Sequence, residues 1–414
     1  MKTIQSSVTS PLISEGMATL KITNGQIITP SQIIPRGDLL VEGTIIRSIT
    51  KGELATEADL IIDAEGMFIA PGFIDLHVHG GGGFDFMDGS LKAFIEIARL
   101  HARHGTTSMT PTTLTSSRED LERVLSIYPE ACRQNQWGAQ FLGMHLEGPY
   151  IAASQRGAQD PRFIRDPDPA EYRDIVERFP FIQRWSAAPE LKGSLALGEF
   201  LRGRGILPAI AHTDAVYDEV REALRCGYTH VTHLYSAMSS ISRRNGFRSV
   251  GVIESALLLR DLSVEIIADG MHLPAPLLKL VYQVKGAEKT ALITDAMRAA
   301  GMPPGASILG STNQGIPVIV EDGVAKLPDR SSFAGSVATA DRLVRNMVGL
   351  AELPLPDAVR MMSATPATIL GLGAQKGSLE LGKDADIVIF DQDISIQRTI
   401  VKGKIVYSRI PDPR

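Results

Sequence analysis

Cysteine is scarce in this sequence, and long apolar runs are missing from it. Only Cys132 and Cys226 occur among 414 residues, which excludes a disulfide framework and is typical of a protein of the reducing cytoplasm. No apolar stretch approaches the length of a membrane-spanning helix, so we expect no membrane partner. Residues 1–16 have no continuous apolar core, which excludes a secretory signal and predicts a loose N-terminal extension.

A strong charge of either sign is also absent. The chain has 42 basic and 47 acidic residues, a net charge of −5, and its basic residues form no long run. Nucleic-acid binding therefore lacks electrostatic support. A composition of 44% hydrophobic and 21% charged residues is typical of a soluble globular protein.

Two styles of apolar patterning divide the chain. Residues 17–72 and 373–414 contain short apolar runs broken by turn dipeptides such as Asn24-Gly25 and Glu42-Gly43, and we expect them to form one small β-sandwich domain together. In residues 73–372, strand-like runs alternate with helical patterns, which predicts an α/β fold, a (β/α)8 TIM-like barrel, with an open doubly wound sheet as the alternative. The expected strands are Phe73–His77, Thr106–Pro111, Gln140–His145, Phe181–Ser186, Leu207–Ala211, Tyr228–Thr232, Ser263–Ala268 and Thr290–Thr294.

The first of these strands ends in two histidines. In "GFIDLHVHGGGG", residues 72–83, His77 and His79 are two positions apart and therefore share one face of the strand. We expect Gly80–Gly83 to leave open space around them. Neutral imidazole is a common ligand of Zn²⁺ and Fe²⁺, although this pair alone fits two structural histidines equally well.

Ligand-type side chains also follow the later strands: Glu147 in "HLEGP", His212 in "AHTD", His233 in "THLY" and Asp295 in "LITDAM". Each alone has a structural explanation, as a core histidine, a turn carboxylate or a helix cap. Active-site residues of such barrels gather at the C-terminal ends of the strands, and carboxylates buried together need a cation. Jointly these residues predict a divalent-metal site, with zinc expected and iron as the alternative.

Several motifs occur in a fixed order over nearly the whole chain: "PGFIDLHVHGGGG", "HLEGPY", "AHTDA", "THLYSAM", "IADGMHL", "LITDAMRAAG" and "FAGSVATADRLVRNM". In this combination the sequence resembles the N-acetylglucosamine-6-phosphate deacetylase family of the amidohydrolase superfamily. The resemblance implies hydrolysis of the N-acetyl group of an amino-sugar phosphate. It also implies one metal at Glu147, His212 and His233, and a second at His77 and His79 that is bridged through Glu147.

The resemblance extends to the substrate side and to the oligomer. It places Arg244, in the loop "SAMSSISRRNGFR", at the phosphate-binding position, where it would reach the active site of a neighbouring subunit in a homodimer. A backbone amide near Ala237 would be a second phosphate donor. Gln159 replaces a histidine that contacts the substrate in the family, and Ser236 replaces an asparagine in the phosphate region. The sugar therefore stays open, and N-acetylgalactosamine 6-phosphate is the alternative substrate.

The expected mechanism needs a general base. A divalent metal lowers the pKa of bound water towards about 7. Asp295, also counted among the metal ligands, is the candidate base that takes the proton and passes it to the departing amine. His272 is the candidate hydrogen-bond partner of the substrate, and we expect Asp269 to be structural.

Two other classes remain open. One is an amidohydrolase with a bridging carboxylated lysine, but the third and fourth expected strands end without lysine, in "HLEGP" and "RWSAAPE". The other is a non-catalytic scaffold, which would be expected to lose metal ligands that this chain keeps.

Overall fold

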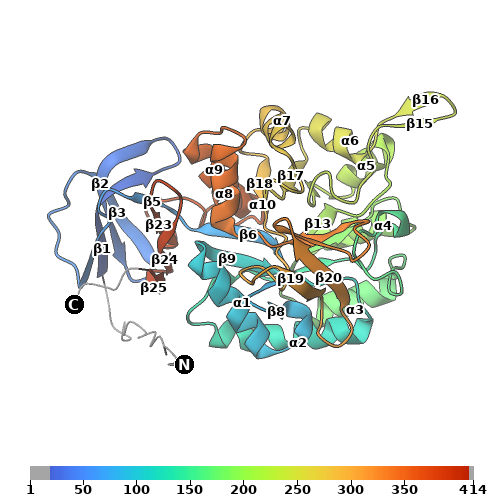
Figure 1. Ribbon diagram of the computed structural model, residues 1–414, viewed down its shortest axis with the longest axis horizontal. Helices are drawn as coiled ribbons and strands as arrows, with labels where there is room; N and C mark the ends of the chain where they lie inside the picture. The colour runs from blue at the N-terminus through green and yellow to red at the C-terminus, as the bar shows by residue number, and fades with distance from the viewer. Residues whose placement is uncertain (1–18, 410–414) are drawn as a thin grey trace.

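The computed structural model describes residues 19–409, except for the side chain of Arg244. The extension expected at residues 1–16 lies outside this range. Figure 1 shows a β-rich part, built from both ends of the chain, beside a larger part in which strands and helices alternate. Within the described range, no helix is both long enough and apolar enough to span a membrane.

The β-rich part is one connected sheet. Its N-terminal strands are β1 (Thr19–Ile28), β2 (Ile33–Glu42), β3 (Ile45–Lys51), β4 (Leu60–Asp63) and β5 (Phe68–Pro71), and its C-terminal strands are β23 (Ile387–Phe390), β24 (Ile396–Val401) and β25 (Lys404–Ser408). β5 and β23 pair antiparallel and join the two chain ends, in the order β25-β24-β23-β5-β1-β2-β3, with β4 beside β1. Buried aliphatic side chains, among them Ile22, Leu39 and Ile389, give this part its own core.

The two expected turns in this part had different outcomes. Glu42-Gly43 connects β2 to β3, as predicted, with Gly43 at a φ of 58°. The prediction for Asn24-Gly25 was wrong, because β1 runs through this dipeptide and the register with β2 shifts there. A side chain at Gly25 would collide with Ile69, so glycine allows a close approach inside a bulged strand.

The larger part contains a curled parallel sheet. Its strands are β6 (Phe73–Val78), β9 (Thr106–Pro111), β10 (Gln140–Phe141), β11 (Met144–Glu147), β12 (Ile182–Ala187), β13 (Leu207–Ile210), β14 (His230–Val231), β17 (Ser263–Ile266) and β18 (Thr290–Leu292). They pair in the orders β10-β9-β6 and β11-β12-β13-β14-β17-β18. The bridges Thr112 to His145 and Val78 to Ala296 connect these two groups at both ends, so the last strand returns to the first. Each expected strand has a counterpart here, and the third is split into β10 and β11.

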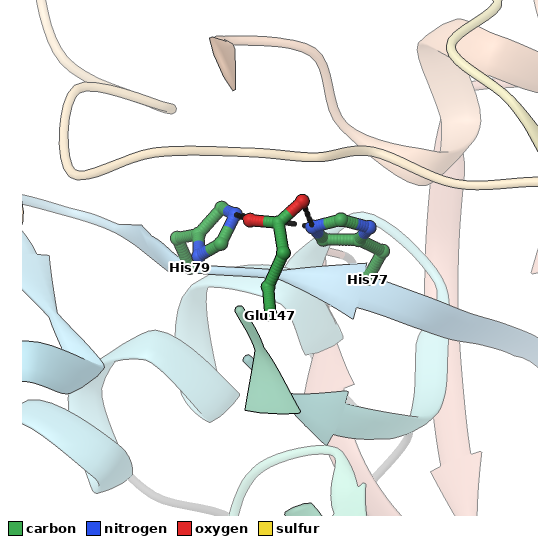
Figure 2. A group of neighbouring side chains, drawn as sticks. All are labelled: His77, His79 and Glu147. Atoms are coloured by element: carbon green, nitrogen blue, oxygen red, sulfur yellow. Dashed lines mark hydrogen bonds and ion pairs between the residues drawn. The ribbon is translucent and has the colours of Figure 1, made fainter. Parts of the chain in front are cut away.

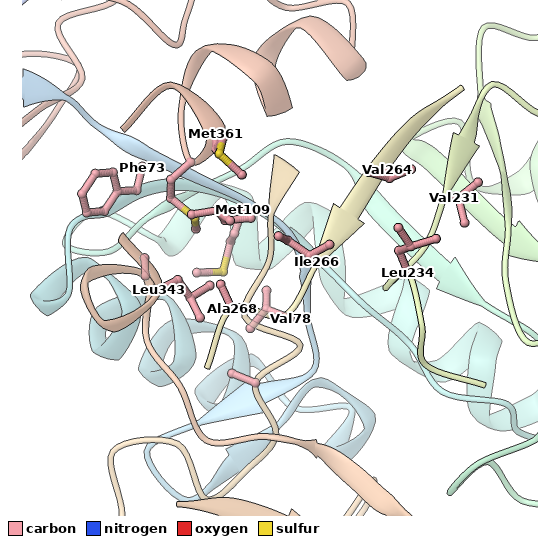
Figure 3. Close-up of a cluster of buried hydrophobic side chains, with 14 of the residues drawn as sticks. Phe73, Val78, Met109, Val231, Leu234, Val264, Ile266, Ala268, Leu343 and Met361 are labelled. Carbon is pink, nitrogen blue, oxygen red and sulfur yellow. The ribbon is translucent and has the colours of Figure 1, made fainter. Parts of the chain in front are cut away.

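Helices alternate with these strands and lie outside the sheet (Figure 1). In α1, Phe94, Ile97 and Ala98 recur at helical spacing and are buried, while Ser90 caps the helix through the amide of Ala93. Figure 3 shows part of the core, in which buried side chains of β6, β9, β14 and β17 belong to one cluster with Leu343 of α8 and Met361 of α9. The helices are α1 (Leu91–Arg103), α2 (Arg118–Gln134), α3 (Pro169–Arg178), α4 (Ser194–Gly203), α5 (Tyr217–Arg225), α6 (Val252–Leu258), α7 (Ala275–Lys285), α8 (Ala340–Gly349), α9 (Leu355–Met361) and α10 (Ala364–Ile369).

Two of the β elements that interrupt the alternation, neither of them predicted, lie in its second half. A four-stranded antiparallel sheet lies between β18 and α8: β19 (Gly305–Leu309), β20 (Ile316–Glu321), β21 (Val324–Lys326) and β22 (Phe333–Ser336). The segment expected to be a loop near Arg244 is a hairpin of β15 (Ser242–Arg244) and β16 (Phe247–Ser249) that extends away from the body in Figure 1. Its turn residues Asn245 and Gly246 both have positive φ, which suits a two-residue hairpin.

Candidate metal centre and active site

His77 and His79 point from the end of β6 toward the carboxylate of Glu147, the last residue of β11 (Figure 2). Nε2 of His77 lies 3.4 Å from Oε1 of Glu147, and Nε2 of His79 lies 3.3 Å from Oε2. The two Nε2 atoms are 3.1 Å apart. All three side chains are buried. Because His77 and His79 are two positions apart in an extended segment, both imidazoles face the carboxylate of Glu147.

A second pair of histidines approaches the same carboxylate. Nε2 of His212 lies 3.3 Å and Nε2 of His233 lies 3.0 Å from Oε1 of Glu147. Oδ1 of Asp295 lies 3.2 Å from Nε2 of His79, which completes the cluster. The structure thus brings together all six side chains that the sequence proposed as metal ligands. Glu147 is common to both groups of three, one with His77 and His79 and one with His212 and His233.

The backbone is unusual where three of these residues leave their strands. His212, His233 and Asp295 follow β13, β14 and β18 with φ values of 46°, 29° and 46°. Left-handed φ costs a non-glycine residue on the order of 1–3 kcal/mol, and such residues cluster at functional sites. Here the turns at the strand ends direct His212 and His233 to Glu147 and Asp295 to His79.

The carboxylates and imidazoles shift each other's pKa. Burial lowers the pKa of His77, but the charges of Glu147 and Asp295 outweigh burial and raise it to about 9. Burial raises the pKa of Glu147, but His77, His212 and His233 hold it well below its usual range. Buried carboxylate oxygens and imidazole nitrogens thus face one another at short distances. A divalent cation bound among them would neutralise the charge of the carboxylates.

The remaining nitrogens of the histidines support this arrangement. Nδ1 of His79 lies 3.3 Å from the backbone oxygen of Thr112, and Nδ1 of His212 lies 2.8 Å from that of Gln155. A carbonyl can only accept, so each Nδ1 carries the hydrogen and each Nε2 is free to bind a metal. Nδ1 of His233 is buried and has no hydrogen-bond partner among the described residues. The donor set therefore fits one or two divalent ions.

A cavity of about 250 Å³ opens next to this cluster and is lined by the substrate-side residues that the sequence proposed: Gln159, Ser236, Ala237 and His272. Nδ1 of His272 lies 2.8 Å from Oδ2 of Asp269, so Asp269, which we expected to be only structural, orients His272. The unpredicted sheet β19–β22 supplies part of the wall through Leu309 and Phe333.

Two expectations about loops need correction. Gly80 and Gly81 do not leave open space, because β7 (Gly80–Gly81) pairs with β8 (Phe84–Asp85) and a side chain at Gly80 would collide with the backbone of Phe84. A side chain at Gly82 or Gly83 would meet no atom nearer than 3.8 Å. Arg244 lies in β15, and its side chain is outside the described part of the structure. The described side chains of its hairpin do not line the cavity.

Sequence reasoning missed two charged residues below the ligands. Arg184 in β12 and Glu265 in β17 are fully buried and form an ion pair, and Glu265 contacts His77. The available signal was a single charge inside each of two apolar strands, "IQRWSA" and "SVEI".

Four imidazoles and two carboxylates at the ends of parallel strands define a metal-dependent hydrolase. The model of the amidohydrolase family matches residues 68–406, and the chain belongs to that family.

Individual relatives are similar over most of the chain. An N-acetylglucosamine-6-phosphate deacetylase of Lysinibacillus sphaericus is 34% identical, with 83% of this chain and 87% of the relative covered. An N-acetylgalactosamine-6-phosphate deacetylase of Escherichia coli O157:H7 is 32% identical, with 83% and 89% covered. A mutant N-acetyl-D-glucosamine-6-phosphate deacetylase of Mycobacterium smegmatis, solved in complex with N-acetyl-D-glucosamine-6-phosphate, is similar with a TM-score of 0.86 and 31% identity, with 94% of this chain and 100% of that chain covered.

Proposed function

We propose that this protein is a metal-dependent deacetylase that hydrolyses N-acetylglucosamine 6-phosphate to glucosamine 6-phosphate and acetate. The observation that carries the proposal is the position of Glu147, shared by two groups of histidines at the base of a cavity. The similarity to deacetylases of amino-sugar phosphates over more than four fifths of the chain supports this substrate class.

The metal site would hold one or two divalent ions. Glu147, His212 and His233 would hold the first, and His77 and His79 would hold a second with Glu147; zinc is expected, and iron is the alternative. When bound, such an ion lowers the pKa of water and polarises the carbonyl of the acetamide.

The protein's own groups would move the proton and orient the sugar. Burial raises the pKa of Asp295, but His77 and His79 outweigh burial and hold it below its usual value, so this carboxylate is ionised and able to accept a proton. Asp295 would take a proton from the attacking water and deliver it to the departing amine. His272, whose Nδ1 is directed to Asp269, would use Nε2 to contact the sugar.

The architecture proposed with this function is a (β/α)8 TIM-like barrel over residues 73–372, with a small β-sandwich domain from residues 17–72 and 373–414. The return of β18 to β6 through the Val78 to Ala296 bridge supports a closed barrel, and the β5–β23 pairing supports one domain from both ends. A barrel would place every ligand at the C-terminal mouth.

We further propose a cytoplasmic homodimer in which Arg244 meets the phosphate in the partner's cavity. The hairpin that carries Arg244 extends from the body, and its Phe247 is 79% exposed, which suits contact with a second copy. Ser236 and Ala237 would border the phosphate from within the same subunit.

N-acetylgalactosamine 6-phosphate is a second candidate substrate. Gln159 and Ser236 line the cavity at positions where they depart from the glucosamine-type pattern, and one relative is named for this epimer. Acetate release from both hexosamines, each with and without the 6-phosphate, tests the proposal. Fastest hydrolysis of a phosphorylated N-acetylhexosamine is expected, and no release from any of the four would contradict it.

A further inference from the structure

A buried ion pair, Arg184 with Glu265, lies next to the candidate metal ligands. The two terminal nitrogens of Arg184, on β12, each lie 2.7 Å from an oxygen of Glu265, on β17. Both residues are 0% exposed. A two-pronged contact of this kind fixes the plane of the carboxylate as well as its position.

The carboxylate of Glu265 reaches both groups of ligands. Oε1 lies 3.2 Å from Nδ1 of His77 and accepts a hydrogen bond from the backbone amide of His233 over 3.3 Å. Oε2 lies 3.0 Å from Nε2 of His230. One carboxylate therefore connects a ring on β6 with the backbone just after β14.

Arg184 contacts the residues that immediately precede His77 and His233. Its guanidinium donates to the backbone oxygen of Leu76, the residue before His77, over 3.2 Å. It also donates to Oγ1 of Thr232, the residue before His233, over 2.7 Å. The ion pair thus contacts both the ligands and the chain that immediately precedes them.

Stability alone does not account for this pair. Replacing a buried ion pair by apolar side chains is often neutral or stabilising, because desolvation offsets the attraction between the charges. Val264 and Ile266, the neighbours of Glu265 in β17, are buried apolar residues that point to the opposite face of the strand, and Glu265 is the one charged residue of β17. The presence of a charged pair therefore needs an explanation other than stability. Its hydrogen bonds to the candidate ligands and to the residues before them supply one.

His77 also differs from the other ligand histidines. The Nδ1 atoms of His79 and His212 face backbone oxygens, whereas Nδ1 of His77 faces the carboxylate of Glu265. An anionic partner fixes the ring orientation, keeps the hydrogen on Nδ1 and makes Nε2 a stronger ligand than a carbonyl partner does.

We propose that Glu265, held in place by Arg184, is a positioning residue for His77 and determines the affinity of the metal position formed by His77, His79 and Glu147. The inference rests on the proposed metal-dependent function. It concerns the strength of metal binding, so it can be measured without substrate.

The test is the zinc affinity of the double variant Arg184→Met/Glu265→Gln, which removes both charges together and leaves neither unpaired. Zinc-loaded protein is equilibrated with a graded series of chelator concentrations, and bound zinc is measured by elemental analysis. Loss of the partner of a ligand histidine typically costs about 10- to 100-fold in metal affinity. We expect the zinc affinity of the position formed by His77, His79 and Glu147 to fall by a factor in that range.

A matched control is the double variant Lys376→Met/Asp386→Asn. Lys376 and Asp386 are also a buried pair, with Nζ and Oδ2 2.6 Å apart. Lys376 also pairs with Asp384 over 2.7 Å, and this group does not contact the ligands. This variant should bind zinc as the wild type does, which separates a positioning effect from a general loss of stability.

Wild-type zinc affinity in folded Arg184→Met/Glu265→Gln would overturn the inference and leave the proposed function intact. If that variant does not fold, Glu265→Gln alone, which keeps the size of the side chain, must still bind zinc at least about 10-fold more weakly. Wild-type affinity there would overturn the inference equally. A wild-type protein that retains no divalent ion would contradict the proposed function itself, and this inference with it.

Discussion

Gln159 donates a hydrogen bond from Nε2 to Oε2 of Glu147 over 2.7 Å. At its other end, Oε1 of Gln159 accepts from the backbone amide of Thr115 over 2.8 Å. The side chain is therefore fixed at both ends and oriented toward the carboxylate that both groups of histidines share. A residue that we expected only on the substrate side also contacts the candidate metal centre.

Gln159→Leu should lower kcat/KM for the deacetylase reaction about 10- to 100-fold. Leucine has a similar size but cannot donate to Glu147, and a hydrogen bond to a charged group contributes about 1.5 to 3 kcal/mol. Gln155→Leu is the control, because the side chain of Gln155 donates to Asp214 and not to Glu147. Equal kinetics for Gln159→Leu and the wild type would show that this hydrogen bond has no role in catalysis.

Asp295→Asn should reduce kcat about 10²- to 10⁴-fold, the usual contribution of a general acid or base. Asparagine keeps the size of the side chain but does not accept a proton. The measurement is steady-state acetate release together with metal content, which should stay close to that of the wild type. Turnover within a factor of two of the wild type would assign the proton transfer to another residue.

Arg244→Ala should weaken the reaction of the phosphorylated sugar about 10- to 100-fold, since a charge-assisted contact contributes about 1.5 to 3 kcal/mol. The unphosphorylated sugar should react at nearly its wild-type rate. Arg243→Ala, in the same strand, is the control. Equal losses on both sugars would mean that Arg244 serves the hairpin or the dimer and not the phosphate.

His101 should make the folded protein sensitive to acid. It is buried in α1, with Nε2 2.9 Å from the backbone oxygen of Gly80, and burial lowers its pKa to about 4. Because the pKa is lower in the folded state than in the unfolded state, the neutral ring contributes stability above about pH 6.5, and this is lost as the pH falls toward 4.

The size of that effect is on the order of 3 kcal/mol between these two pH values. His101→Gln does not titrate, so its free energy of unfolding should fall less steeply over the same range. Urea unfolding at pH 7.5, 5.5 and 4.5 measures both proteins. Parallel pH profiles would exclude His101 as the cause.

The sequence predicted the strands of the larger part well, because apolar runs bounded by turns and separated by amphipathic helices form a strong periodic pattern. The ligand cluster followed from the positions of His77, Glu147 and Asp295 at strand ends. The sheet β19–β22 was missed although β20 (Ile316–Glu321) is an apolar run followed by the turn dipeptide Asp322-Gly323. Its first strand, Gly305–Leu309, is mostly exposed and carries a weak apolar signal.

The contacts below the ligands were not predictable from one sequence for a different reason. Arg184 and Glu265 are 81 residues apart, and β13 and β14 separate their strands in the sheet, so only the curl of the sheet brings them together. The first two glycines after His79 were misinterpreted because the sequence does not reveal that Phe84 and Asp85 pair back onto Gly81 and Gly80.

The most direct test of the account is acetate release from N-acetylglucosamine 6-phosphate by one preparation as purified, after exhaustive chelation, and after zinc is restored. We predict that chelation removes the activity, that zinc returns it, and that His212→Ala is inactive even with zinc at the same concentration, because Glu147 and His233 alone hold the ion poorly. Undiminished acetate release from protein in which elemental analysis finds no metal would contradict the account.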